Sequence, residues 1–256
     1  YGLSLVPVPI GIWLILAGVV GIILFACWET GISNPVLSID LFRKNKVFTF
    51  SNFAALINYS ATFAIGFLLS LYLQYIKGLD PQSAGLVLVS QPLIMALFSP
   101  LAGRLSDTIE PRILASTGMA VIVVGLIPLV FLGAQTSLAL IVFCLLILGF
   151  GFALFSSPNT NAVMSSVPKN YYGTASAMLA TMRTIGQLLS MGIVMLIMAV
   201  NMGKTQITPE NYLFFLYSVK ISFITFAFLC FGGIFASLAR GKAVAALNES
   251  LNHSQD

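Results

Sequence analysis

The sequence predicts an all-helical integral membrane protein, because its composition is strongly apolar and its apolar residues come in long runs. Of the 256 residues, 58% are hydrophobic and 8% are charged, whereas about 25% of the residues of an ordinary soluble domain carry charge. A helix needs about 20 apolar residues to cross hydrocarbon about 30 Å thick. Strands of a membrane barrel need only about ten residues and alternate in polarity, so the continuous runs favour helices.

Seven windows of the chain are long and apolar enough to be transmembrane helices. In chain order they are residues 10–28, 47–76, 83–103, 113–132, 138–157, 174–200 and 213–238. The sequence therefore predicts seven spans joined by short connectors.

The lysines and arginines of the connectors predict the orientation, because these residues are enriched on the cytoplasmic side of a membrane. The side that we assign to the cytoplasm carries Arg43, Lys44, Lys46, Arg104, Arg112, Lys169, Arg240 and Lys242. The opposite side carries only Lys77 and Lys204. We therefore expect a multi-pass protein of the cell membrane whose chain begins outside and ends in a cytoplasmic tail.

Few residues have the chemistry of a catalytic or metal site. The cysteines Cys27, Cys144 and Cys230 lie in apolar runs, where a lone thiol behaves as a small hydrophobe. The single histidine, His253, lies in the polar tail. Phosphate-binding glycine loops, metal-ligand spacings and paired nucleophiles and bases are not found in the sequence. The net charge of +4 is scattered among the spans, so we expect no enzyme, no cofactor, no metal and no nucleic-acid partner.

One charged stretch stands out between two predicted spans. "GRLSDTIEPR", Gly103 to Arg112, resembles a loop motif of the major facilitator superfamily, in which Gly-x-Leu-x-Asp is followed by a glycine and basic residues. Glu110 stands where that glycine is usual, and it is a competitor of Asp107 for the arginines. The resemblance implies a gate formed by Gly103, Arg104, Asp107, Arg112 and Arg183.

Two interpretations of this stretch remain open. In one, it is a solvated turn whose charges orient the chain. In the other, Asp107 is a latch that pairs with Arg112 or caps the N-terminus of a neighbouring helix. Breaking such a latch would shift the balance between two conformational states.

Two longer segments are similar to the fourteen-helix drug:proton antiporters of the same superfamily. Residues 28–48 resemble the connection after the extra central helix pair, and residues 149–187 resemble the segment joining the twelfth and thirteenth helices, with "SSPN" as a helix breaker. The resemblance implies a central transmembrane helix with its cytoplasmic connector at 1–46, a C-terminal six-helix half at 47–240 and a polar tail at 241–256.

The resemblance also implies partners and a function. The chain starts at Tyr1, and we expect it to be an excerpt that lacks an N-terminal half of six helices. Substrate would bind between the two halves near the middle of the bilayer. The expected function is export of hydrophobic or amphipathic drugs in exchange for protons.

Polar and aromatic residues within the predicted spans are candidates for the substrate path, because polar groups in a membrane helix usually face the bundle interior or a wet cavity. The predicted lining residues are Asn58, Tyr59, Thr62, Phe63, Gln91, Met95, Phe155, Asn159 and Gln187. The alternative is that they hold helices together by hydrogen bonds. Pro92, next to Gln91, is expected to bend its helix.

Charges inside the spans are few. Arg183 lies about ten residues into its predicted span, where it either serves the gate, or tunes a distant acid, or extends to the inner surface. All eight acidic residues fall in connectors, helix ends or tails, although a proton carrier is normally an intramembrane acid or histidine. We therefore expect the coupling acids to lie in the other half of the protein.

Two further functions remain as alternatives. A different branch of the same fold would carry one defined metabolite. A protein of another class, a membrane scaffold or sensor that does not transport, would use the seven helices alone.

Overall fold

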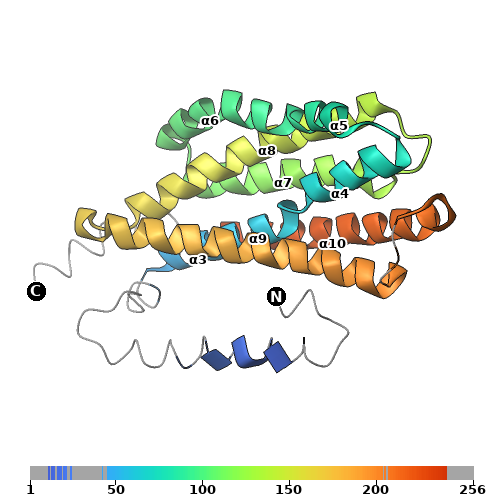
Figure 1. Ribbon diagram of the computed structural model, residues 1–256. Helices are drawn as coiled ribbons and strands as arrows, with labels where there is room; N and C mark the ends of the chain where they lie inside the picture. Colours follow the sequence, from blue (N-terminus) through green and yellow to red (C-terminus); the bar gives the residue numbers. More distant parts are fainter. Residues whose placement is uncertain are drawn as a thin grey trace, which may run out of the picture.

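The structure is a computed structural model that describes residues 45–203, 205 and 207–240, together with Phe42 and a few residues between positions 11 and 24. The described part of the chain is helical between short turns and holds no strand (Figure 1). The predicted first span at 10–28, the connector before residue 45 and the tail at 241–256 lie mostly or wholly outside the described residues.

Six stretches of the described chain are long and apolar enough to cross a membrane: Lys46–Ile76, Pro81–Thr108, Pro111–Val130, Leu138–Ser165, Lys169–Met202 and Pro209–Leu238. They are built from α3 (Lys46–Thr62), α4 (Ile65–Leu71), η2 (Tyr72–Ile76), α5 (Pro81–Leu88), α6 (Ser90–Thr108), α7 (Pro111–Val130), α8 (Leu138–Ser165), η3 (Lys169–Tyr171), α9 (Tyr172–Met202), η4 (Pro209–Asn211) and α10 (Tyr212–Leu238). These stretches confirm the six predicted spans from residue 47 onward.

Side-chain caps and prolines set where several helices begin. The side chain of Asn45 accepts a hydrogen bond from the backbone N–H of Phe48 at the start of α3 (2.9 Å), and Asp80 accepts from the N–H groups of Gln82 and Ser83 at the start of α5. Such caps satisfy N–H groups that have no partner within the helix. Pro111 occupies the first position of α7, where its missing N–H costs nothing.

Two of the spans are interrupted. Between α5 and α6 the interruption falls at Val89, just before Pro92, whose nitrogen cannot donate to the carbonyl of Leu88; this agrees with the expected bend. Between α3 and α4 the backbone N–H of Ala64 donates to the hydroxyl of Ser190 in α9 (3.0 Å). Insertion of a side chain into the hydrogen-bond ladder is a common cause of a kink.

The expected helix breaker "SSPN" does not break its helix. α8 continues through Pro158 to Ser165, eight residues beyond the predicted end at 157. A proline removes one backbone hydrogen bond, and membrane helices tolerate it where neighbouring groups satisfy the freed carbonyl. The prediction of a break at this position was therefore wrong.

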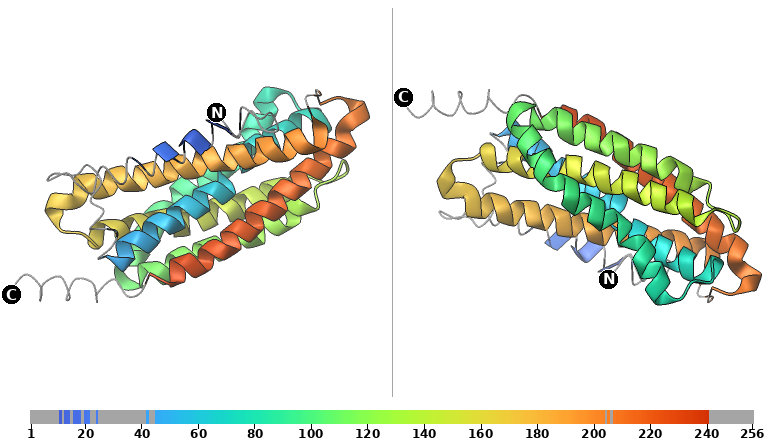
Figure 2. Two further views of the ribbon diagram at one scale, coloured as in Figure 1. Left: turned by 90° about the horizontal axis from the view of Figure 1, so that it is seen from below. Right: turned by 90° about the horizontal axis from the view of Figure 1, so that it is seen from above.

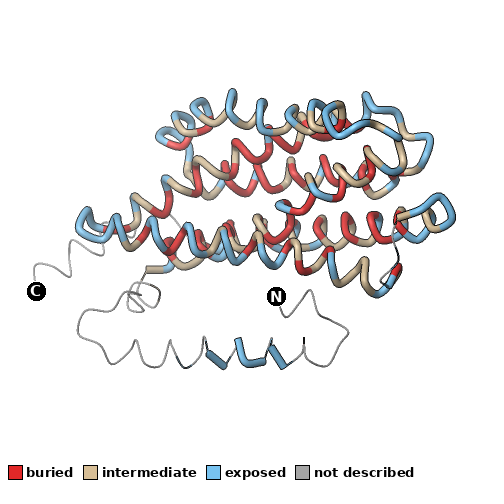
Figure 3. The backbone as a smooth tube through the Cα atoms, in the orientation of Figure 1, coloured by how far each residue is buried: buried red, intermediate tan, exposed pale blue. Residues whose placement is uncertain are grey.

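The six spans form an elongated bundle in which α8 packs against both α6 and α7, α10 against α7 and α3, and α9 mainly against α3 (Figures 1 and 2). Gly118 of α7 and Gly151 of α8 meet at the α7–α8 contact. Small residues at such contacts let helix backbones approach closely in a membrane. The buried residues gather where these helices face one another (Figure 3).

The outer span made by α5 and α6 is covered least. Only 6% of its most apolar window is buried, against 56% for the span Lys46–Ile76. Its exposed side chains include Leu86, Leu93, Leu97 and Leu101. This face is apolar and suits contact with lipid or with another membrane-embedded surface.

A buried polar cluster joins α3, α7, α8 and the end of α10. Arg240, which is 1% exposed, donates from Nη1 to the Ser51 hydroxyl (3.1 Å) and to Oδ1 of Asn159 (3.0 Å). It also donates from Nε to the carbonyl of Ser237 (2.8 Å) and from Nη2 to the Ser237 hydroxyl (2.5 Å). Ser116 of α7 donates to that hydroxyl (2.9 Å). We call these five residues the Arg240 cluster.

The interpretation of Arg240 as a solvated orienting charge is thus incomplete. Burial lowers the pKa of Arg240 to about 10, and the nearby positive charge of Arg112 acts in the same direction. The guanidinium remains protonated at neutral pH. Its four hydrogen bonds to neutral groups offset part of the cost of removing the charge from water.

Substitution of Arg240 tests the Arg240 cluster. Arg240→Met leaves the polar atoms of Ser51 and Asn159 without their buried partner, and we expect a loss of about 2–4 kcal/mol of stability. Arg104→Met removes an exposed arginine and is the matched control, with an expected change within about 0.5 kcal/mol. Thermal unfolding of the purified protein in detergent measures both. Equal effects of the two substitutions would contradict a structural role for Arg240.

A second prediction concerns the α7–α8 contact. A Cβ atom at Gly118 would lie 2.7 Å from both the carbonyl oxygen of Gly151 and the backbone nitrogen of Phe155, so Gly118→Ala has to push the two helices apart. We expect a loss of about 1–3 kcal/mol, seen as a lower unfolding temperature.

The matched control for Gly118 is Gly85→Ala in α5. A Cβ atom there meets nothing within 4 Å, and alanine favours a helix by about 1 kcal/mol over glycine. The unfolding temperature should therefore stay the same or rise. If both variants unfold at the wild-type temperature, α7 and α8 do not pack as closely as described.

Candidate functional site

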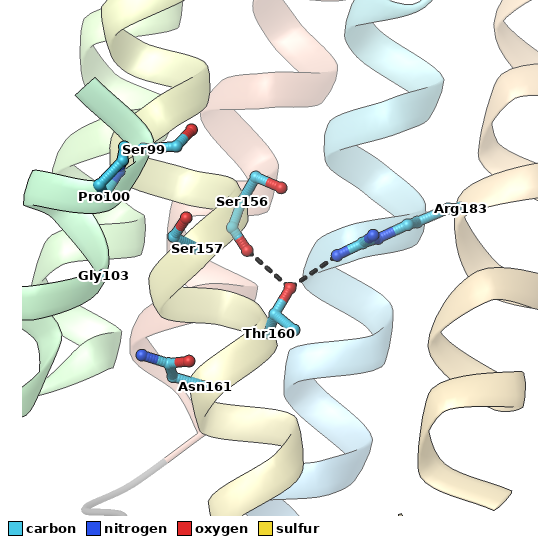
Figure 4. A pocket seen from close by; sticks show the side chains of 8 residues that line it. All are labelled: Ser99, Pro100, Gly103, Ser156, Ser157, Thr160, Asn161 and Arg183. Atoms are coloured by element: carbon cyan, nitrogen blue, oxygen red, sulfur yellow. Dashed lines mark hydrogen bonds between the residues drawn. The ribbon is translucent and has the colours of Figure 1, made fainter. Parts of the chain in front are cut away.

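A polar cavity of about 430 Å³ lies beside α8, between α6 and α9. Figure 4 shows its lining residues, which α6, α8 and α9 contribute. They are Ser99, Pro100, Gly103, Ser156, Ser157, Thr160, Asn161 and Arg183. The lining is unusual in this apolar bundle because it consists mostly of hydroxyl and amide side chains.

Helix periodicity brings the lining residues together. Ser156 and Thr160 lie four residues apart on α8, as do Ser157 and Asn161, and residues four apart share one face of a helix. Ser99 and Gly103 have the same spacing on α6. All of these positions belong to the C-terminal halves of α6 and α8. α6 leads into the stretch that holds Arg104, Asp107, Glu110 and Arg112, which we call the charged turn.

Arg183 crosses from α9 to α8. It lies eleven residues after Tyr172, the first residue of α9, a distance of about 16 Å along the helix axis. Its Nη2 donates to the Thr160 hydroxyl (2.7 Å), and its guanidinium carbon is 5.6 Å from the ring centre of Tyr59. Thr160 in turn donates to the carbonyl of Ser156 (2.8 Å) (Figure 4). The side chain is therefore held at the cavity wall rather than extended to the end of the bundle.

The cavity is connected to the charged turn by hydrogen bonds. Nδ2 of Asn161 donates to the hydroxyl of Ser106 (2.6 Å), and that hydroxyl donates to the carbonyl of Gly103 (2.6 Å). These contacts attach the end of α8 to the end of α6.

Within the charged turn, Arg112 pairs with Glu110 and not with Asp107. Nε of Arg112 lies 2.7 Å from Oε2 of Glu110, with both side chains 28% exposed. Arg104 and Asp107 are exposed, and neither side chain makes a hydrogen bond or ion pair with another described residue. The predicted pairing of Asp107 with Arg112 is therefore absent, because Glu110, only two residues away from Arg112, takes its place.

Four of the predicted lining residues lie inside the bundle. Asn58 is 0% exposed, Phe155 and Asn159 are 1% exposed, and Thr62 is 2% exposed. Thr62 donates to the carbonyl of Asn58 (2.6 Å), and Asn159 belongs to the Arg240 cluster. The alternative interpretation, hydrogen bonding between helices, describes Asn159, whereas the bond of Thr62 stays within α3. The amide of Asn58 has no hydrogen-bond partner in the described part of the chain.

The other five predicted lining residues are more accessible. Tyr59, Gln91, Met95 and Gln187 are half-buried, and Phe63 is 48% exposed. Tyr59 contacts Arg183 at the cavity. Of all the predicted site residues, only Gly103 and Arg183 line the cavity itself.

The sequence analysis did not identify Ser99, Thr160 and Asn161 as site residues. A signal was present, because small polar residues repeat at a spacing of four along 156–161. Asn159, the residue of this stretch that was predicted to line the path, instead accepts a hydrogen bond from Arg240.

Several known proteins are similar in sequence to this chain. The pattern that defines the Major Facilitator Superfamily matches residues 2–191. The riboflavin transporter RibZ of Clostridioides difficile is 34% identical over 171 residues, which cover 66% of this chain and 37% of RibZ. The multidrug resistance protein Stp of Mycobacterium tuberculosis is 28% identical over 186 residues, which cover 73% of this chain and 34% of Stp.

Other relatives agree with these. The lincomycin resistance protein LmrB of Listeria monocytogenes is 28% identical over 185 residues, which cover 72% of this chain and 39% of LmrB. The chain thus spans about a third to two fifths of the length of these three relatives.

A solved structure shares the fold. It is the crystal structure of a bacterial homolog to the human lysosomal transporter Spinster, in an inward-facing and occupied conformation. The two match with a TM-score of 0.64 at 14% sequence identity, over 78% of this chain and 50% of that chain. With a family pattern that matches most of its length and a transporter fold to agree with it, this multi-pass membrane protein belongs to the Major Facilitator Superfamily.

Proposed function

We propose that the chain is part of a secondary active transporter that exports hydrophobic or amphipathic compounds in exchange for protons by alternating access. The observation that carries this proposal is the cavity at α8, which is lined mostly by hydroxyl and amide side chains. Relatives named for multidrug and lincomycin resistance support export of such compounds.

Proton coupling would depend on residues outside this chain. Among the described residues, Asp107 and Glu110 lie at the charged turn, Asp80 caps α5 and Glu210 lies in η4. None of these acids is in the middle of a span, where a proton carrier is expected. The proposal therefore assigns the coupling acids to an N-terminal half of six helices, with the charged turn facing the cytoplasm.

A carrier for one defined metabolite is the second candidate. The relative RibZ, at 34% identity, is named as a riboflavin transporter. Competition experiments separate the two candidates, because a metabolite carrier should be inhibited by one compound and should confer no drug resistance.

Dye efflux tests the proposed function. Cells expressing the full-length gene should lose a preloaded amphipathic dye faster than cells with an empty vector, and a protonophore should abolish the difference. Efflux that continues after collapse of the proton gradient would contradict proton exchange. Efflux blocked by riboflavin alone would favour the metabolite carrier.

Asp107→Asn tests the remaining latch hypothesis. Asp107 lies in the last turn of α6, where a negative charge is unfavourable, and it has no partner among the described residues in this conformation. A latch requires that it cap a helix N-terminus in another conformation. We expect Asp107→Asn to lower the export rate by up to about tenfold, which corresponds to about 1.4 kcal/mol, with normal membrane insertion.

Glu210→Gln, at the opposite end of the bundle, is the matched control. It also neutralises an exposed carboxylate and should leave export unchanged. An unchanged rate in Asp107→Asn would leave the charged turn with an orienting role alone.

A further inference from the structure

We infer that the cavity between α6, α8 and α9 binds an anionic group of the transported compound, a carboxylate or a phosphate, and that Arg183 is its counter-charge. This inference rests on the proposed function and adds the class of substrate. It concerns the residues of this chain only.

Arg183 is the one charged residue of the cavity lining, and none of the lining residues is acidic. The contacts of its guanidinium are neutral: the hydroxyl of Thr160 and the ring of Tyr59. Arg183 forms no ion pair with an acid of the described chain. Arg183 is half-buried. A positive charge that is partly removed from water and has no anion beside it is unfavourable, so an anion entering the cavity would be stabilised.

Most of the donors of Arg183 are unused. A guanidinium has five N–H donors, and within the described chain only Nη2 is hydrogen-bonded. Nε also has no partner but is buried, so the donors open to a ligand in this conformation are those of the two Nη atoms. The guanidinium matches the two oxygens of a carboxylate or phosphate and binds them with two parallel hydrogen bonds. Arg183 therefore retains the donors that such a group requires.

The wall of α8 adds further donors. The hydroxyls of Ser156 and Ser157 face the cavity (Figure 4) and make no side-chain hydrogen bond to other described residues. Arg240 is different, because four of its N–H groups are already bound and it is 1% exposed. Of these two arginines, only Arg183 is placed to meet a ligand.

The apolar part of an amphipathic anion also has a surface to contact. Tyr59, which does not line the cavity itself, lies beside Arg183, and Phe63, the residue that follows the end of α3, is 48% exposed. The cavity volume of about 430 Å³ is within the range of about 300–1,000 Å³ that is usual for small-molecule sites. The combination fits an aromatic compound with one acidic group, and it disfavours a cation.

A pair of dyes that differ in one charge provides the test. We would measure binding of dansylglycine, which has a single carboxylate, and of its uncharged methyl ester to the purified full-length protein by fluorescence anisotropy. The variants are Arg183→Gln, Arg183→Lys and, as control, Lys220→Gln. Lys220 is an exposed cation of α10 near the ring of Phe131 and lies outside the cavity.

The expected result is specific for charge. Wild type should bind the acid more tightly than the ester. Arg183→Gln should weaken binding of the acid at least tenfold, which corresponds to about 1.4 kcal/mol. The same substitution should change binding of the ester less than about twofold. Arg183→Lys should restore part of the preference, and Lys220→Gln should keep all of it. Equal affinity of the wild type for the two dyes, or equal losses in Arg183→Gln, would overturn the inference.

A lipid headgroup presents the same phosphate chemistry, so the source of the anion needs its own measurement. Binding would be repeated in nanodiscs of phosphatidylcholine with and without phosphatidylglycerol. Retention of dye affinity in both supports a transported compound as the occupant. Competitive displacement by phosphatidylglycerol assigns the cavity to a lipid and overturns the inference.

Efflux assays separate this inference from the proposed function. Export of the ester or of the cationic dye ethidium without any preference for the acid in binding would retain the function and overturn the inference. Binding of the acid that depends on Arg183, with no efflux of any dye, would support the inference and contradict the function.

Discussion

Close packing of α8 against its neighbours is the constraint on which the rest of this structure depends. Lipid is as apolar as the side chains, so helices in a membrane gain little from hydrophobic burial and depend on close contact and hydrogen bonds. Gly118 and Gly151 let α7 touch α8, and Gly149 of α8 lies against the backbone of Gln91 in α6. With these two sides of α8 occupied, its hydroxyl-bearing face is left to form the cavity.

Two adjacent polar residues of α8 show the same difference between its packed faces and its cavity face. Asn159 and Thr160 differ by about 100° around the helix, and each accepts a hydrogen bond from a different arginine. Asn159 meets Arg240 inside the bundle, where nearly every donor of the guanidinium is used. Thr160 meets Arg183 at the cavity, where most donors remain unused. The first arrangement is complete in itself and stabilises the fold, whereas the second lacks an acceptor that only a ligand or another part of the protein can supply.

Hydropathy alone predicted the six described spans, because a membrane helix has to be about 20 apolar residues long whatever its neighbours are. The bend at Pro92 was also predictable, because its cause, the missing N–H of the proline, is local. The break at Ala64 was not, because its cause is the hydroxyl of Ser190, which is 126 positions away. Arg240 was predicted only as an orienting charge on the cytoplasmic side, because the sequence shows that it follows a span but not that it contacts Ser51 and Asn159.

The site was less predictable than the fold, because the face of each polar side chain decides its role. Asn58 and Asn159 have the polar side chains expected of lining residues, yet both are buried within the bundle. Glu110, the departure from the superfamily motif, was the more informative residue, since it explains why Arg112 is unavailable to Asp107.

The position of Arg183 also bears on how a bound compound would affect the conformation. In alternating access, a ligand shifts the equilibrium only as far as it binds one state better than the other. α9 packs mainly on α3, and the bond from Arg183 to Thr160 is a link between α9 and α8 at the cavity. A ligand bound side-on through Nε and Nη2 would require the guanidinium to turn, because Nε is buried in this conformation, and turning would strain the bond from Nη2 to Thr160. Binding would then weaken the link that holds α9 to α8. Such a link has to weaken if a transporter with bound ligand is to change conformation more readily than an empty one.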